Sequence, residues 1–201
     1  MLKILVIYTF VFMDVNEKTY SDYMMVISPP AEVEEMIRKY KKASARLIGD
    51  FEGMYSKAHI SITNQHRQMP DMMQQKLDCY MRPINRLRPV PMYVNGFSYF
   101  THGNTTATIY AKIELTPEVT NWFLHIKRIF GDKRKDTAPH ITVAKSIPME
   151  HFQKLWPKFI GQQYQFEFTP QSVTVLSRPM IGGHGKYWTP FKELYFNNFG
   201  Y

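Results

Sequence analysis

Two short segments of this chain could carry out acid–base chemistry. Each places a histidine in an apolar run, with a hydroxyl residue two positions later. The segments are AHISIT at 58–63, with His59 and Ser61, and PHITV at 139–143, with His140 and Thr142. Residues i and i+2 of a β-strand point to the same face, so each segment would present an imidazole beside a hydroxyl. Two such strands facing one cleft would supply two proton carriers and two hydrogen-bond donors, which suits in-line attack at a phosphodiester.

The pattern is selective within the chain. The other five of the seven histidines fail this pattern, which requires a hydroxyl residue two positions later and apolar residues at the second and fourth positions. A structural role, with both histidines satisfied on buried strands, is the alternative to a catalytic one. The surroundings of the two motifs favour the catalytic interpretation, because they also repeat.

The sequence around the motifs is duplicated. Residues 23–33 and 109–119 each read as a strand that runs into a helix start, and Val33 corresponds to Val119, an offset of 86. The two histidines are offset by 81, from His59 to His140. Each half therefore has the order strand, helix, loop, histidine-bearing strand, helix. A strand-rich stretch follows each half, at 91–100 and 164–177.

This duplication predicts the fold class. We expect an α+β fold in which two strand-helix-strand-helix units form a bilobal structure, with two antiparallel-rich sheets flanking a central cleft. The repeat halves span about 20–100 and 105–201, and together they form one domain over 1–201, since each needs the other to bury its sheet.

Four helices support this layout through apolar residues at helical spacing. The first carries Val33, Met36, Ile37, Tyr40 and Leu47; the second Met73, Leu77, Tyr80 and Ile84; the third Val119, Trp122, Phe123, Ile126 and Ile129; the fourth Phe152, Leu155, Trp156 and Phe159. Thr116 is placed to cap the third helix, and Pro117 suits its first turn. The fourth helix should begin near Pro148.

Residues 1–14 lie outside the repeat. The run MLKILVIYTFVFM at 1–13 resembles a short signal peptide, but it is too short to span a membrane and no small-residue cleavage site follows it. We expect an extra strand at a sheet edge and no membrane partner. Met13 as the native start is the alternative.

The net charge of the chain indicates which kind of partner it binds. The net charge of +8 favours anionic partners such as RNA or nucleotides. The densest basic run, at 127–135, would be either a phosphate-attracting rim or a solvated loop.

Cys79 is the single cysteine, so no disulfide or zinc cluster of cysteines can form within the chain. We expect it to be at least half-buried in the second helix, in a cytoplasmic protein that is a monomer.

The paired motifs resemble those of the two-histidine (2H) phosphoesterase superfamily, which includes RNA 2',5'-ligase-like proteins and cyclic phosphodiesterases. The family carries two copies of His-x-Thr/Ser-x, which stand here as HISI at 59–62 and HITV at 140–143. The stretch TAPHITVAK also resembles the family pattern around the second motif, with Lys145 at its basic position. Ser61 is a permitted variant of threonine, whereas Ala58 replaces a common proline. The resemblance covers about 20–201.

This resemblance implies a mechanism. One of His59 and His140 would deprotonate water or a ribose hydroxyl, and the other would protonate the leaving oxygen. Ser61 and Thr142 would bind the non-bridging phosphoryl oxygens. The implied substrate is a 2',3'-cyclic phosphate or a 2'-5' linkage in RNA or a nucleotide, with no cofactor and no metal. The sequence does not assign which histidine is the acid.

Weaker candidates for substrate binding lie outside the motifs. Phe97, Tyr99 and Phe100 could stack a base, although aromatic residues in strands commonly belong to the core. Lys145 could bind phosphate. The glycine-rich stretch IGGHGKYW at 181–188 could contact an anion through His184 and Lys186, with a plain hairpin as the alternative.

Two other functions compete with the enzyme. One is a non-catalytic module that binds RNA ends or nucleotides on the same fold, and the intact residues of both motifs count against it. The other is a metal hydrolase that uses the two histidines. The only acid near either histidine in sequence is Asp136, which lies outside the strand, so the metal ligands would be incomplete.

Overall fold

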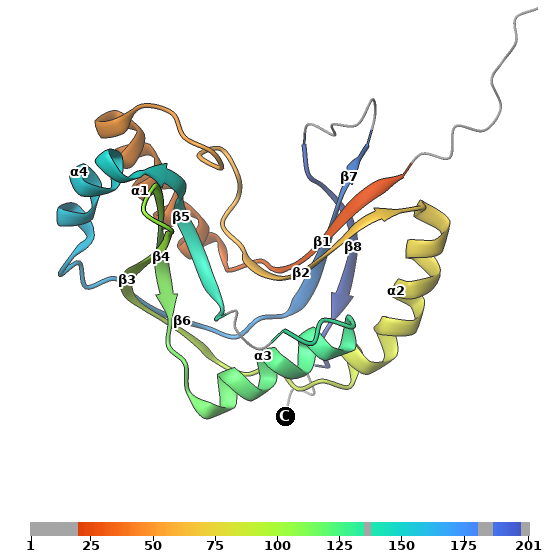
Figure 1. Cartoon of the computed structure of the whole chain (residues 1–201). Coiled ribbons are helices and arrows are strands. Elements are labelled where there is room, and N and C mark those ends of the chain that lie inside the picture. Colours follow the sequence, from red (N-terminus) through yellow and green to blue (C-terminus); the bar gives the residue numbers. More distant parts are fainter. Residues whose placement is uncertain (1–19, 135–137, 181–186, 198–201) are drawn as a thin grey trace, which may run out of the picture.

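The computed structural model describes residues 20–134, 138–180 and 187–197 of the chain. Within these residues there are four helices and eight strands (Figure 1), and the predicted order of strand, helix, histidine-bearing strand and helix occurs twice. Their bounds are β1 Ser21–Ile27, α1 Ala31–Ile48, β2 Ile60–Gln68, α2 Pro70–Asn85, β3 Met92–His102, β4 Thr106–Ile113, α3 Pro117–Ile129, β5 His140–Pro148, α4 Met149–Phe159, β6 Gln165–Phe168, β7 Ser172–Pro179 and β8 Thr189–Tyr195. The N-terminal segment 1–14 lies outside the described residues.

The strands form one sheet in the order β6-β3-β4-β5-β2-β1-β7-β8, and neighbouring strands are antiparallel. The expected α+β fold is confirmed, but the expectation of two sheets needs correction. The two four-stranded halves are joined where β2 meets β5, and the one residue pair recorded there is Ile60 with Ile141. A sequence pattern predicts strands, whereas this junction depends on how two distant strands approach each other.

The sheet order reflects the duplication. β2 and β5 are equivalent and lie at the centre, flanked by the equivalent strands β1 and β4. The next strand on each side is exchanged between the repeats, because β3 pairs with β4 of the second repeat and β7 pairs with β1 of the first. β3 and β7 therefore each complete the half-sheet that begins with the other repeat.

The helices are exchanged in the same way. α1 packs against α4 and β5, while α3 packs against α2 and β2. Figure 1 shows the helices on the outer side of the curved sheet, α1 and α4 beside the β3–β4–β5 half and α2 and α3 beside the other half. The inner side of the central strands carries no helix in that view.

The helices begin and end largely where the sequence predicts. The hydroxyl of Thr116 accepts a hydrogen bond from the backbone N–H of Val119 at 3.2 Å, which confirms the predicted cap of α3. α4 begins at Met149, directly after Pro148. The residues of the apolar stripes are buried or half-buried, with one exception in α1: Leu47 is 55% exposed. Its position on the helix is rotated away from the buried face, which includes Ile37, Lys41 and Ser44.

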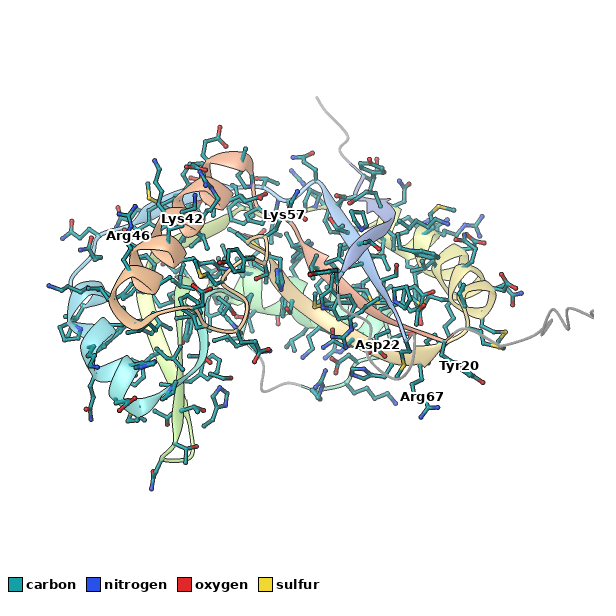
Figure 2. All side chains as sticks on the ribbon, turned by 90° about the horizontal axis from the view of Figure 1, so that it is seen from above. Tyr20, Asp22, Lys42, Arg46, Lys57 and Arg67 are labelled. Atoms are coloured by element: carbon teal, nitrogen blue, oxygen red, sulfur yellow. The ribbon has the colours of Figure 1, made fainter. Side chains whose placement is uncertain are left out.

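Equivalent strands share a backbone irregularity. Arg67 of β2 and Ser146 of β5 both adopt positive φ, +50° and +48°. In each case a side chain from the neighbouring strand accepts a hydrogen bond from the irregular residue's N–H: the Asp22 carboxylate at 3.1 Å for Arg67, and the Thr108 hydroxyl at 3.0 Å for Ser146. Figure 2 shows Asp22 and Arg67 close together. Asp22 and Thr108 are also 86 residues apart, so the duplication extends to these contacts.

One expectation for a side chain is wrong. Cys79 is exposed on α2 rather than buried, since the helix turns Met73 and Leu77 toward the core instead.

Among the helices of the described ranges, none is both long and apolar enough to cross a membrane.

Candidate active site

The register of β2 and β5 brings the two histidine motifs together. Since Ile60 pairs with Ile141 in antiparallel strands, one step outward places His59 opposite Thr142 and Ser61 opposite His140. The alternation of side chains puts these four polar residues on one face of the sheet. The other face holds the apolar residues of the motifs, which are buried: Ile60, Ile62, Ile141 and Val143. Each hydroxyl thus faces the histidine of the opposite strand.

Both imidazoles are oriented by the same contact. Nδ1 of His59 lies 2.9 Å from the carbonyl oxygen of Lys57, and Nδ1 of His140 lies 2.9 Å from that of Ala138. A carbonyl oxygen can only accept, so Nδ1 carries the hydrogen and donates it. In the neutral ring, Nε2 then has a free lone pair and can accept a proton. The two histidines are prepared alike for proton transfer at Nε2.

The surroundings of His59 favour its neutral form. Burial lowers the pKa of His59, and the electrostatic effects of Lys41, His140 and Lys145 act in the same direction. The bond to the Lys57 carbonyl opposes them. With a lowered pKa, His59 is neutral at neutral pH, and the neutral ring is the form that can accept a proton.

Aromatic rings surround His140. The ring of Tyr110 lies 5.0 Å from the imidazole and that of Phe100 lies 5.5 Å from it, centroid to centroid, and the two rings are 5.3 Å apart. Tyr110 pairs with Thr142 in the register of β4 and β5. These two aromatic residues therefore border the polar face on the β4 side.

Of the three aromatic residues predicted to stack a base, the structure brings only Phe100 to His140. Phe97 packs against Tyr40, Phe159 and Tyr164. Tyr99 packs against Phe152 and Trp156 on α4. The alternation along β3 separates Phe97 and Tyr99, which face the helices, from Phe100 on the opposite face.

Basic side chains lie around the same face. Lys145 forms an ion pair with Glu52 at 2.6 Å, so its charge is shared with a carboxylate of the loop that precedes β2. Lys112 pairs with His140 in the register of β4 and β5 and is exposed. His184 and Lys186 lie outside the described residues.

Two neighbours of the motifs, Tyr110 and Lys112, are absent from the sequence-based site. The order of elements in the sequence already indicates that β4 lies near the second motif, because β4 precedes that motif as β1 precedes the first. An antiparallel register between β4 and β5 then places residues 110 and 112 beside Thr142 and His140. The sequence pattern does not give the register between β4 and β5, which is needed to identify these two residues.

No group of three or more histidine, cysteine, aspartate or glutamate side chains that could hold a metal ion occurs within the described ranges. The chemistry offered by the described residues is proton transfer at two imidazoles and hydrogen bonding from two hydroxyls. Both fit a phosphoryl group placed between β2 and β5.

Comparison with known proteins supports this interpretation at the level of family and fold. Residues 29–179 match the model of the 2'-5' RNA ligase superfamily, a range that includes both motifs. No curated protein matches the chain.

Several solved structures share the fold. E. coli LigT complexed with phosphate is 11% identical with a TM-score of 0.61, over 90% of this chain and 99% of LigT. LigT complexed with 3'-AMP is 10% identical with a TM-score of 0.61, over 89% and 98%. TT0787 of Thermus thermophilus is 13% identical with a TM-score of 0.57, over 87% and 97%.

Proposed function

Because the chain belongs to the 2'-5' RNA ligase superfamily, we propose that it is a phosphoesterase acting on a 2',3'-cyclic phosphate or a 2'-5' phosphodiester of RNA or a nucleotide. The observation that carries this proposal is the pairing of β2 with β5 at Ile60 and Ile141. That register gives two imidazoles, each with Nδ1 engaged and Nε2 available, and two hydroxyls on one face.

The proposed reaction uses the two histidines in opposite protonation states. One neutral imidazole removes a proton from the attacking oxygen of water or a ribose hydroxyl. The other, protonated imidazole donates its proton to the leaving oxygen as the P–O bond breaks. Proton exchange with solvent then restores both rings. In-line attack requires the two rings on opposite sides of the phosphorus, and two histidines on adjacent strands from different repeats would meet this requirement.

The hydroxyls of Ser61 and Thr142 would stabilise the phosphoryl group. Charge builds up on the non-bridging oxygens in the transition state, and fixed donors aimed at these oxygens lower the barrier. Because side chains supply both the proton transfers and this stabilisation, we expect turnover to continue in the presence of a chelator.

Substrate recognition would come from the residues around His140. Tyr110 and Phe100 offer ring faces for a base, and Lys112 offers a positive charge for phosphate. The complexes of LigT with phosphate and with 3'-AMP support an anionic nucleotide ligand on this fold. The net charge of +8 is in keeping with such a ligand.

A panel of dinucleotides and cyclic mononucleotides tests the proposal. We expect turnover of 2',3'-cyclic mononucleotides or of 2'-5'-linked dinucleotides, and none of 3'-5'-linked dinucleotides or of 3',5'-cyclic mononucleotides. Binding without turnover across the whole panel would instead indicate a non-catalytic module. Equal turnover of both linkage types would contradict recognition of the 2'-oxygen.

A further inference from the structure

Each of the two helices that precede a histidine motif contains a buried lysine. Lys41 of α1 is 3% exposed and Lys127 of α3 is fully buried. They are 86 residues apart, the same offset as the starts of the two helices at Ala31 and Pro117. The two lysines therefore occupy equivalent positions in the repeats. Lysine is rarely buried without partners that satisfy its charge, so the contacts of both side chains should explain why they lie there.

Lys41 binds the loop that leads to His59. Its Nζ donates to the carbonyl oxygens of Gly53 and Ser56, both at 2.9 Å, and contacts the Ser56 hydroxyl at 3.0 Å. That hydroxyl donates in turn to the Gly53 carbonyl at 2.7 Å. The next residue, Lys57, supplies the carbonyl oxygen that holds Nδ1 of His59. A continuous set of bonds therefore runs from α1 to the His59 imidazole.

Lys127 makes the equivalent contact in the second repeat. Its Nζ donates to the carbonyl oxygen of Arg134 at 2.7 Å, in the loop that leads to His140. It also lies 3.9 Å from the carboxylate of Asp132, which accepts further bonds from the Arg134 guanidinium. Lys127 is thus paired with a carboxylate. Within the described residues, Lys41 forms no ion pair, and its contacts there are with neutral oxygens.

We propose that Lys41 is a positioning residue for His59, which fixes the loop that orients the imidazole and holds an uncompensated positive charge near it. Lys127 binds the Arg134 carbonyl in the segment that precedes the second motif, but Asp132 offsets its charge. The duplicated halves would then orient their histidines alike while treating them differently in charge. This inference rests on the proposed function for its kinetic consequence only, since the effect on His59 exists without substrate.

The charged and titratable groups that act on His59 come from two elements. α1 contributes Lys41, and β5 contributes His140 and Lys145. Lys145 is opposed by Glu52, its ion-pair partner. Burial lowers the pKa of Lys41 to about 8. Lys41 is therefore charged at neutral pH, and its charge disappears as the pH rises through about 8.

The first test is the titration of His59 in the resting protein, followed by NMR of the imidazole. Lys41→Gln keeps a donor for the loop carbonyls and removes the charge, so we expect His59 to bind its proton at higher pH than in the wild type. Lys42→Gln is the matched control, because Lys42 is exposed on the same helix (Figure 2) and loses the same formal charge. We expect it to leave the titration of His59 unchanged.

A measurement on the unaltered protein guards against a variant that fails to fold. In the wild type, the His59 signal should show a second, smaller inflection near pH 8, where Lys41 loses its proton. The same inflection should be missing in Lys41→Gln. The absence of this inflection in the wild type would overturn the proposal, and so would an unchanged His59 titration in Lys41→Gln.

The kinetic test separates positioning from stability. The glutamine side chain is one bond shorter than lysine and cannot reproduce all three contacts of Lys41, so the loop moves slightly and misplaces the imidazole relative to the phosphorus. We therefore expect Lys41→Gln to lower kcat by about tenfold to a hundredfold with little change in KM. The limb of the pH–rate profile that follows His59 should move with its NMR titration. If the wild type lacks turnover but the NMR results hold, the proposed function fails and the role of Lys41 stands. If turnover is observed but the NMR titrations do not differ, the role of Lys41 fails and the proposed function stands.

Discussion

Ile60 and Ile141 form the backbone pair that joins β2 to β5, and both side chains are fully buried. Each isoleucine lies between the histidine and the hydroxyl residue of its own motif. Their pairing therefore sets the register of all four polar side chains at once. A shift of one residue between these strands would turn the motifs to opposite faces. The site depends on this contact between the repeats more than on either repeat alone.

The first prediction concerns this junction. Ile141→Val removes one methyl group from the core and should lower the free energy of unfolding by about 0.5–1.5 kcal/mol. We also expect a measurable fall in kcat, because the junction positions the imidazoles. Ile84→Val in α2 is the control, since Ile84 is equally buried and α2 packs mainly against α3 and β8. Chemical denaturation and steady-state kinetics measure both effects. An equal loss of activity in the two variants would argue against a special role for the junction.

The second prediction concerns the hydroxyls. Thr142→Val preserves the shape of the side chain and removes its donor, so kcat should fall by about tenfold to a thousandfold, as for the loss of one oxyanion donor. Ser61→Ala should act in the same direction. Thr101→Val provides the comparison, because Thr101 is an exposed threonine on β3. Wild-type kcat in Thr142→Val would show that this hydroxyl does not contact the phosphoryl group.

The third prediction separates the two faces of β3. If Phe100 stacks a base, Phe100→Leu should raise KM for a nucleotide by about fivefold to a hundredfold, in line with about 1–3 kcal/mol per stacked base. Tyr99→Leu should instead lower the melting temperature and leave KM unchanged, because Tyr99 packs against Phe152 and Trp156. A rise in KM for Tyr99→Leu alone would restore the sequence-based assignment and remove Phe100 from the site.

The fourth prediction concerns pH. The pKa of His59 is lowered in the folded state by burial and by neighbouring charges. In the window below the ordinary value of 6.5, the unfolded chain therefore binds more protons at this residue than the folded protein does. The contribution of His59 to stability is thus present above 6.5 and is lost as the pH falls through its lowered pKa. Denaturant unfolding at a series of pH values should show a steeper loss below 6.5 for the wild type than for His59→Asn. Parallel curves would contradict the lowered pKa.

Local features of the fold were readable from the sequence because they depend on neighbouring residues. Thr116 and Pro117 mark the start of α3 through their own chemistry, and the alternation in the two motifs identifies β2 and β5. The duplication also supplied the order of elements. Each of these features depends on residues within one turn of helix or a few positions along a strand.

Features that depend on distant pairing could not be predicted in the same way. The exchange of β3 and β7 between the repeats leaves no local mark in the sequence. The register of β4 against β5 decides that Tyr110 and Lys112, rather than Phe97 and Tyr99, lie beside the motifs. The sequence alone does not single out Lys41, because an apolar stripe predicts which residues are buried. A buried lysine contradicts that rule unless the loop carbonyls that bind it are known.

The most direct test of the account is the ring opening of an RNA that ends in a 2',3'-cyclic phosphate, measured with pure protein in EDTA. The comparison uses His59→Ala, His140→Ala and, as a control, His66→Ala, whose histidine is exposed on the same strand as the first motif. We predict turnover by the wild type and by His66→Ala, and a loss of about a hundredfold or more in each of the other two variants. Full activity in either His59→Ala or His140→Ala would contradict the two-histidine mechanism.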